Sequence, residues 1–303
     1  MWRAEVYAVI QMMHRNLTQG DLAIERMCAL AGVSRAGYYR AWQSSAPREE
    51  ETGLRDGIQR IALASRGYGY RRIAAALRRE GWNANHKRVL RLMRLDNLLC
   101  LRRKPFVPVT TDSNHAWHIV PNLARGLQVT KIDQLWVADI TYIRLAEEFG
   151  YLAVVLDAFS RKVVGWAMAD HLRASLAIEA LATALHERRP APETLIHHSD
   201  RGVQYACGEY MELLRAHAVQ PSMSRAGNPY DNAKAESFMK TLKTEEVDGR
   251  AYRNIHLAKE QVGDFIDNVY NRSRLHSALG YRSPLEFEAN YNSAHSPAAW
   301  AAE

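Results

Sequence analysis

The stretch "LWVADITYI" (residues 135–143) has the composition of a buried strand with one acidic residue at its centre. Its β-branched and aromatic residues favour a strand inside a sheet. Asp139 interrupts this apolar run, and burying a carboxylate without a partner is costly. The stretch therefore predicts the middle of a sheet, and it marks Asp139 as a residue that packing alone does not explain.

Strands and helices alternate on either side of this stretch. Five strand candidates are expected, at 135–143, 151–159, 162–170, 194–200 and 219–224. Apolar residues at helical spacing predict helices at 175–189, 208–218, 231–247 and 257–271. This order indicates an α/β domain, with a mixed five-stranded sheet covered by helices.

Two further acids stand at positions that suit chemistry. Asp200 ends the strand candidate in "LIHHSDRGVQY" (195–205), and Glu236 lies in the helix expected from 231. Glu236 shares one face of that helix with Lys240 and Lys243, while apolar residues occupy the opposite face. Three carboxylates are a donor set for Mg²⁺ or Mn²⁺, which prefer oxygen ligands. Spacing alone leaves other readings open, because 33 acidic residues allow many such triples and Asp200 can also mark an ordinary surface turn.

The two parts of the chain differ in charge. Residues 1–104 carry 20 Lys and Arg against 9 Asp and Glu, whereas residues 105–303 carry 20 against 24. A basic region of this density indicates a polyanionic partner such as DNA, although a solvated helical surface is the plainer alternative.

Two helix-turn-helix patterns lie in the basic part. In 21–42, Gly32 separates two helical stretches and Ser34 is placed to cap the second, which carries Arg35 and Arg40. In 70–99, Gly81 marks the turn and Asn85 the next cap. Val89, Leu92 and Met93 are expected to face a core. The side chains expected to contact DNA from this second helix are Lys87, Arg88, Arg91 and Arg94.

Composition also indicates the cellular compartment in which the protein is expected. The chain has no apolar run long enough to span a membrane and no evident signal peptide. Its three cysteines are scattered, which argues against a disulfide framework or a thiolate zinc site. A cytoplasmic protein, associated with the bacterial nucleoid when bound to DNA, is the expectation.

Several long motifs resemble one family. The phrases "VVLDAFSRKVVGW", "HHSDRGVQY", "SMSRAGNPYDNAKAESFMKTLKTE" and "YNRSRLHSALGYRSPLEFE", with "LWVADITYI", are similar to the OrfB catalytic subunits of IS-three-type insertion sequences, which are DDE transposases related to retroviral integrases. With two N-terminal phrases, the resemblance covers roughly residues 22–291. It implies a ribonuclease H-like catalytic core preceded by an all-α, helix-turn-helix DNA-binding region.

The resemblance also implies a mechanism. Carried over by position, the catalytic triad falls on Asp139, Asp200 and Glu236, with Lys243 seven residues after the glutamate. Two Mg²⁺ or Mn²⁺ ions per active site are expected, with Asp139 bridging them. Residues that are candidates for supporting these acids are His198, Arg201 and Asn232.

The implied reaction nicks the ends of the element and joins the freed 3′-hydroxyl to another DNA strand. The implied partners are double-stranded DNA (terminal inverted repeats and target), further copies of the chain in a synaptic complex, and an OrfA protein or an OrfAB fusion.

The expected domain boundaries follow from these patterns. They are a helix-turn-helix-like region at 1–46, a second basic one at 47–104, a linker at 105–130, the catalytic core at 131–250, a C-terminal helical extension at 251–291 and a disordered tail at 292–303. Two other functions remain open from the residues. One is a DNA-binding regulator without catalysis, and the other is a ribonuclease H-like nuclease that cuts without joining.

Overall fold

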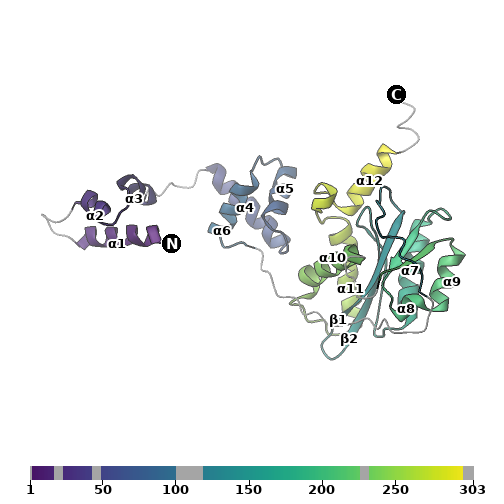
Figure 1. Cartoon of the computed structure of the whole chain (residues 1–303). Helices are drawn as coiled ribbons and strands as arrows, with labels where there is room; N and C mark the ends of the chain where they lie inside the picture. The colour runs from purple at the N-terminus through teal and green to yellow at the C-terminus, as the bar shows by residue number, and fades with distance from the viewer. Residues whose placement is uncertain (1, 17–22, 43–48, 100–118, 226–231, 296–303) are drawn as a thin grey trace, which may run out of the picture. The chain divides into compact units, whose positions relative to one another are not determined.

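The computed structural model describes residues 2–16, 23–42, 49–99, 119–225 and 232–295. The chain forms two compact units, residues 1–57 and 58–303. Figure 1 shows the elements of both units. Along the described ranges, no helix has the length and apolar character needed to cross a membrane.

The first unit is a small helical cluster. Its helices are α1 (Trp2–Asn16), α2 (Ile24–Leu30), α3 (Arg35–Trp42) and the start of α4 (Glu49–Ala64). The Ser34 hydroxyl accepts a hydrogen bond from the Gly37 amide at 3.0 Å, and Gly32 adopts a φ of 65°, so the expected cap and turn are confirmed. The side chains that form its core are Ile10, Met27, Cys28 and Tyr38.

The second unit begins with a helical region. The remainder of α4 is followed by α5 (Tyr70–Arg79) and α6 (His86–Leu95). Asn85 caps α6 by accepting from the Lys87 amide at 2.9 Å, as predicted. The apolar face of α6 is fully buried, at Val89, Leu92 and Met93. The charged residues of this helix are thereby left on its outer side.

A mixed five-stranded sheet forms the centre of the second unit. Its strands are β1 (Leu135–Arg144), β2 (Phe149–Asp157), β3 (Val163–Ala169), β4 (Ile196–Ser199) and β5 (Gln220–Met223), in the order β3-β2-β1-β4-β5. The first three are antiparallel, while β4 is parallel to both β1 and β5. The sheet confirms the fold class expected from the sequence.

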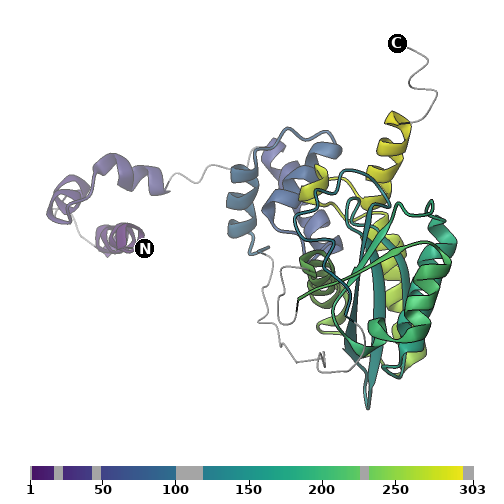
Figure 2. The same cartoon turned by 45° about the vertical axis from the view of Figure 1, so that its right-hand side comes forward.

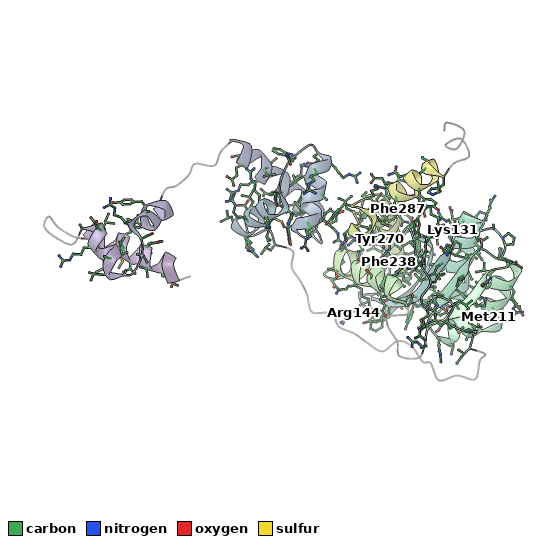
Figure 3. The ribbon with its side chains drawn as sticks, turned by 45° about the horizontal axis from the view of Figure 1, so that its top comes forward. Lys131, Arg144, Met211, Phe238, Tyr270 and Phe287 are labelled. Carbon is green, nitrogen blue, oxygen red and sulfur yellow. The ribbon has the colours of Figure 1, made fainter. Side chains whose placement is uncertain are left out.

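Helices cover both faces of the sheet (Figure 1). One face packs against α7 (Ala174–Arg188), α8 (Val203–Ala206) and α9 (Gly208–Ala216). The other packs against α10 (Ala233–Leu242) and α11 (Ile255–Asp264). In Figure 3, Phe238 and Tyr270 lie on this second side and Met211 lies on the first. The apolar face predicted for α10 is therefore the face that packs on the sheet, and Phe238 meets Tyr270 edge-on at 4.8 Å.

Several elements differ from the sequence-based expectation. The helices predicted at 231–247 and 257–271 each end in a π-helical segment, η2 (Lys243–Val247) and η3 (Phe265–Asn271), and a short 3₁₀ turn η4 (Ser277–Leu279) follows. Helix α12 (Pro284–Ala294), capped by Ser283, continues past residue 291, so the tail expected from 292 is helical at its start. Within the expected linker, residues 119–130 form neither helix nor strand. Ala124, Leu127 and Val129 nevertheless pack against the core. Residues 105–118 and 296–303 lie outside the described ranges.

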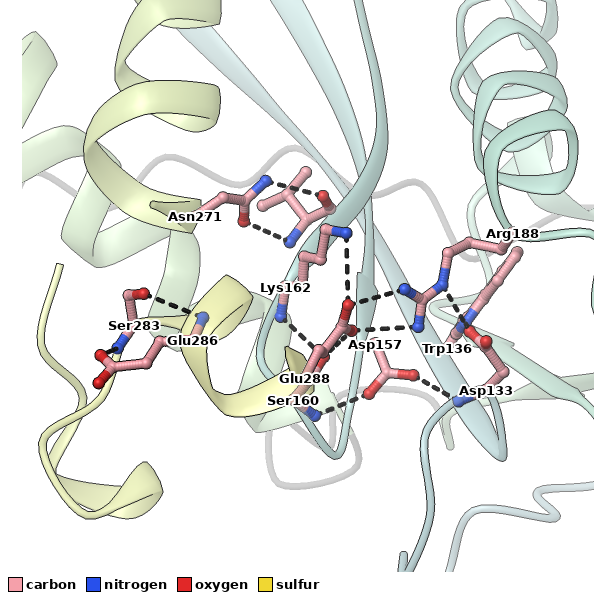
Figure 4. A network of polar contacts seen from close by, with 11 residues as sticks. Asp133, Trp136, Asp157, Ser160, Lys162, Arg188, Asn271, Ser283, Glu286 and Glu288 are labelled. Atoms are coloured by element: carbon pink, nitrogen blue, oxygen red, sulfur yellow. Dashed lines mark hydrogen bonds and ion pairs between the residues drawn. The ribbon is translucent and has the colours of Figure 1, made fainter. Parts of the chain in front are cut away.

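A buried polar network fixes α12 to the start of β1 (Figure 4). Glu288 accepts two hydrogen bonds from Arg188, at 2.8 and 3.1 Å, and one from Ser160 at 2.7 Å. Lys162 adds an ion pair to the same carboxylate at 3.3 Å. Asp157 accepts from the backbone amides of Asp133, Phe159 and Ser160 at 2.7 to 2.8 Å. Asp157, at the end of β2, therefore has a structural role.

Candidate active site

The strand register brings two of the three predicted acids together. The last paired residues of the parallel strands β1 and β4 are Val137 and His198, and β4 ends at Ser199. Asp139 and Asp200 each follow this pair by two residues, so they stand side by side where β4 stops. The turn after β4 is held by the Gly202 amide, which donates to Asp200 Oδ1 at 3.0 Å. Two carboxylates distant in sequence thus share one edge of the sheet.

Asp139 is the most perturbed member of this group. Its Oδ1 accepts a hydrogen bond from the adjacent Ile140 amide at 2.8 Å. Burial, followed by the negative charge of Asp200 and then that of Glu236, raises the pKa of Asp139 to about 7. The positive charge of Lys243 acts in the opposite direction but is the smaller influence. At neutral pH the Asp139 carboxyl therefore lacks full compensation for its charge.

Glu236 lies close enough to act on Asp139 but stands further out. It is an exposed residue in the first turn of α10, and burial raises the pKa of its carboxyl. In the part of the chain that the structure describes, no three His, Cys, Asp or Glu side chains are arranged to hold a metal ion as they stand. The structure thus joins Asp139 with Asp200 and leaves Glu236 at the rim of the site.

The two lysines predicted on α10 differ in environment. Lys240 is exposed, whereas Lys243 is half-buried at the end of the helix. The Lys243 ammonium lies 4.5 Å from the centroid of the Tyr142 ring. Burial lowers the pKa of Lys243, while the charge of Asp139 raises it in part. Of these two lysines, Lys243 is therefore the one that lies close enough to act on Asp139.

A small recess opens between the two aspartates and contains a residue that the sequence analysis did not single out. Tyr205 lines it together with Asp139, Asp200 and Gln204. The Tyr205 hydroxyl is buried and has no hydrogen-bond partner among the described residues, and burial together with Asp200 raises the pKa of this phenol well above its ordinary value. Its place five residues after Asp200, in "DRGVQY", was the only available signal. An unpaired buried hydroxyl beside two carboxylates indicates room for a polar ligand or water.

The three supporting candidates all fasten the loops that carry the acids. His198 is fully buried and its ring nitrogens bond the hydroxyls of Ser222 and Ser224 at 2.8 and 2.9 Å, which links β4 to β5. Arg201 donates to the Ser224 carbonyl at 2.7 Å, and Asn232 donates to the Ala138 carbonyl at 2.9 Å.

The residues predicted to contact DNA lie on helices. In α6, Lys87, Arg91 and Arg94 are exposed and Arg88 is half-buried. In α3, Arg35 forms an ion pair with Glu25 at 3.3 Å, and Arg40 belongs to the same helix, although its side chain lies outside the described ones. Whether these side chains contact DNA stays a prediction.

Comparisons with known proteins follow the same division of the chain. Residues 48–106 match a family model described as "HTH-like domain", and residues 130–229 and 217–284 match two models described as "Integrase core domain". A protein of Shigella sonnei described as "Insertion element IS600 uncharacterized 31 kDa protein" is 37% identical over 88% of this chain and 98% of its own length. The Escherichia coli protein "Transposase InsF for insertion sequence IS3A" is 35% identical over 89% of this chain and 95% of its own length.

Solved structures give weaker likenesses. The simian T-cell lymphotropic virus intasome matches with a TM-score of 0.41 at 16% identity, over 80% of this chain and 75% of that chain. The HTLV-2 integrase catalytic core in complex with magnesium matches with a TM-score of 0.39 at 15% identity, over 52% of this chain and 96% of that one. Scores this low bear neither on the chemistry of the site nor on assembly.

Proposed function

Because the chain belongs to the IS3 family of insertion-sequence transposases, we propose that it cuts DNA at the ends of such an element and joins the freed 3′-hydroxyl to another strand. It is thus an enzyme of the polynucleotidyl-transferase type, and Asp139, Asp200 and Glu236 are the acids we assign to catalysis. The observation that carries this assignment is the meeting of Asp139 and Asp200 at the end of β4, where burial and mutual repulsion raise the pKa of Asp139 to about 7.

The donor set fits a hard divalent cation. Asp139 and Asp200 offer oxygen ligands only, and a cation between them would relieve the repulsion that perturbs Asp139. The unpaired Tyr205 hydroxyl beside them could bond a water that accompanies the ion. Glu236 completes the set once its exposed side chain turns toward Asp139. We therefore propose Mg²⁺ or Mn²⁺, with two ions per site, held by Asp139 and Asp200 and by Asp139 and Glu236.

Such cations lower the pKa of an attacking water or hydroxyl and stabilise the leaving oxygen of a phosphodiester. The protein contributes position and charge. Arg201 and Asn232 fasten the segments that carry Asp200 and Glu236, so the backbone at these two acids is held in place. Lys243, beside Asp139, and Lys240, one turn earlier, would neutralise the phosphates on either side of the cut.

The basic helices α3 and α6 bind the DNA. In this proposal the exposed side chains of α6, with Arg35 and Arg40 of α3, bind the terminal repeats and direct the scissile phosphate to the acids. Two such ends must meet for joining, which implies a complex of several copies of the chain. An OrfA partner and action in the bacterial cytoplasm, at the nucleoid, belong to the same proposal.

Strand-resolved analysis of labelled DNA tests the function. The full chain is incubated with Mg²⁺ and duplexes that carry the two DNA flanks of its own coding sequence. We expect shorter labelled strands from cutting at the element's ends and longer ones from joining. Short products alone would favour a nuclease without joining, and binding without either product would favour a regulator.

A further inference from the structure

One face of the hairpin formed by β1 and β2 is rich in aromatic side chains. Tyr142 pairs with Tyr151 across the two antiparallel strands, and Arg144 pairs with Phe149. Residues two apart on a strand point to the same side, so these four side chains share one face. Tyr142, Phe149 and Tyr151 are called the aromatic face below. The hairpin projects from the sheet at the end away from α12 (Figures 1 and 2), and Arg144 marks its end in Figure 3.

The aromatic face is open at its outer end, since Tyr142 and Tyr151 are half-buried, with Tyr151 packed against the core, whereas Phe149 is exposed. Phe149 is 48% exposed, which makes it the most exposed large apolar side chain among the described residues from 119 to 295. Its ring meets Tyr142 edge-on at 5.6 Å, and the Lys243 ammonium stands 4.5 Å from the centre of the Tyr142 ring. Cross-strand packing accounts for paired aromatic residues, but it does not account for leaving the outermost ring in solvent.

The aromatic face continues into the recess that contains the acids. Tyr142 and Tyr151 line this recess together with Asp139 and Asp200. Because β4 pairs with β1 only as far as Val137, the segment of β1 that carries Tyr142 extends past the end of β4. A ligand whose phosphate lies at the acids would therefore have the aromatic face directly beside it.

We propose that the aromatic face stacks an unpaired DNA base next to the scissile phosphate. Aromatic rings accept any base because every base has a flat apolar surface. Lys243 and Arg144 flank the rings with positive charge, which suits the phosphates on either side of that base. A nucleotide offers both features, whereas an apolar peptide segment offers no match to the two cations. The proposal rests on the proposed function only in placing the scissile phosphate at Asp139.

Stacking implies that the DNA end is partly unpaired when it is bound. The turn of the hairpin carries the exposed acids Glu147 and Glu148, which repel a phosphate backbone. The bound DNA strand is therefore directed along the side of the hairpin that faces the recess and not across the turn of the hairpin. Opening the last base pairs frees one base for the aromatic face, and the energy of stacking offsets part of the cost of opening.

Binding measured without a divalent cation tests this inference separately from catalysis. The full chain is titrated, in a chelator, against a labelled blunt duplex and the same duplex with a short unpaired thymidine tail at one 3′ end. We expect about tenfold tighter binding of the tailed form, and in Phe149→Ala a preference close to one. Because both probes contain the same duplex, contributions from the basic helices cancel.

Two variants control for folding. Phe149→Leu retains apolar packing on Tyr142 but removes the aromatic plane, so it should lose the preference while thermal stability is kept. Val269→Ala, which alters another exposed apolar side chain, should keep the preference. Equal binding of both probes by the wild-type chain, or a preference that survives in Phe149→Leu, would overturn the inference. A change of oligomeric state in Phe149→Leu without a change in tail preference would assign the face to a protein contact and overturn it as well.

Discussion

Two groups of acids lie near strand β1, and they differ in how many hydrogen-bond donors and cations their carboxylates contact. At the start of the strand, Asp157 accepts three backbone amides and Glu288 binds Arg188, Lys162 and Ser160. Further along, Asp139 accepts one backbone amide and faces Asp200. Because an uncompensated buried charge is costly, its presence indicates a role that needs it. The first group holds the fold together, and the second is the group that we propose binds a cation.

The largest expected difference between the groups concerns activity. Asp139→Asn keeps the shape of the side chain but removes its charge, as do Asp200→Asn and Glu236→Gln. Each should reduce cutting and joining of labelled element ends below detection, because cations then lack a ligand. DNA binding should remain.

The exposed Asp170, at the end of β3, offers a matched control. Asp170→Asn should leave both reactions near the wild-type level. Cation-dependent cutting that persists in any of the three triad variants would count against the assignment.

The free energy of unfolding should depend on the first group of acids, whereas activity depends on the second. Glu288→Gln removes the anion that Arg188 and Lys162 share and leaves Arg188 with Asp133 alone, which should cost about 3 kcal/mol in the free energy of unfolding. Chemical denaturation measures this loss, and Glu260→Gln, at an exposed acid of α11, should change it little. A neutral result for Glu288→Gln would mean that the network is not a source of stability.

The pH dependence of stability should identify Asp139 as uncompensated. Its folded pKa of about 7 lies above the unfolded value of about 3.9. The folded state therefore binds the proton more tightly, and ionisation destabilises it progressively as the pH rises from about 4 to 7. In a chelator, Asp139→Asn should match the wild type near pH 4 and exceed its stability by about 4 kcal/mol above pH 7. Parallel pH profiles for the two proteins would show that Asp139 is compensated after all.

The smallest expected effect concerns the basic helix α6, to which neither group of acids belongs. Replacing Arg88 and Arg91 by Gln should weaken DNA binding and reduce the slope of log affinity against log salt by about one per lost phosphate contact. Cutting at saturating DNA should change less than binding. An unchanged slope would assign these side chains to another task.

The sequence allowed the fold and several candidate residues to be predicted for physical reasons, whereas the choice of the triad came from the family resemblance. Asp139 was visible because a charge inside an apolar strand breaks its pattern, and the helical face of Glu236, Lys240 and Lys243 follows from a fixed angle per residue. Similarly, the caps at Ser34 and Asn85 depend only on neighbouring residues. Local rules were sufficient wherever the decisive contact was short in sequence.

Other features depend on contacts between distant segments. The closeness of Asp139 and Asp200 requires the register of β1 with β4, which no local pattern specifies. The unpaired hydroxyl of Tyr205 becomes visible only when α8 lies beside that edge. Likewise, the fixing of α12 by Glu288 joins residues a hundred or more positions apart.

Calorimetric titration of Mn²⁺ into the full chain, without DNA, is the most direct measurement. If the acids at the end of β4 are a cation site, the wild type should bind Mn²⁺ and Asp139→Asn should lose that binding, while Glu288→Gln, under conditions where it remains folded, should retain it. Failure of the wild type to bind, or equal binding by the wild type and Asp139→Asn, would contradict the account.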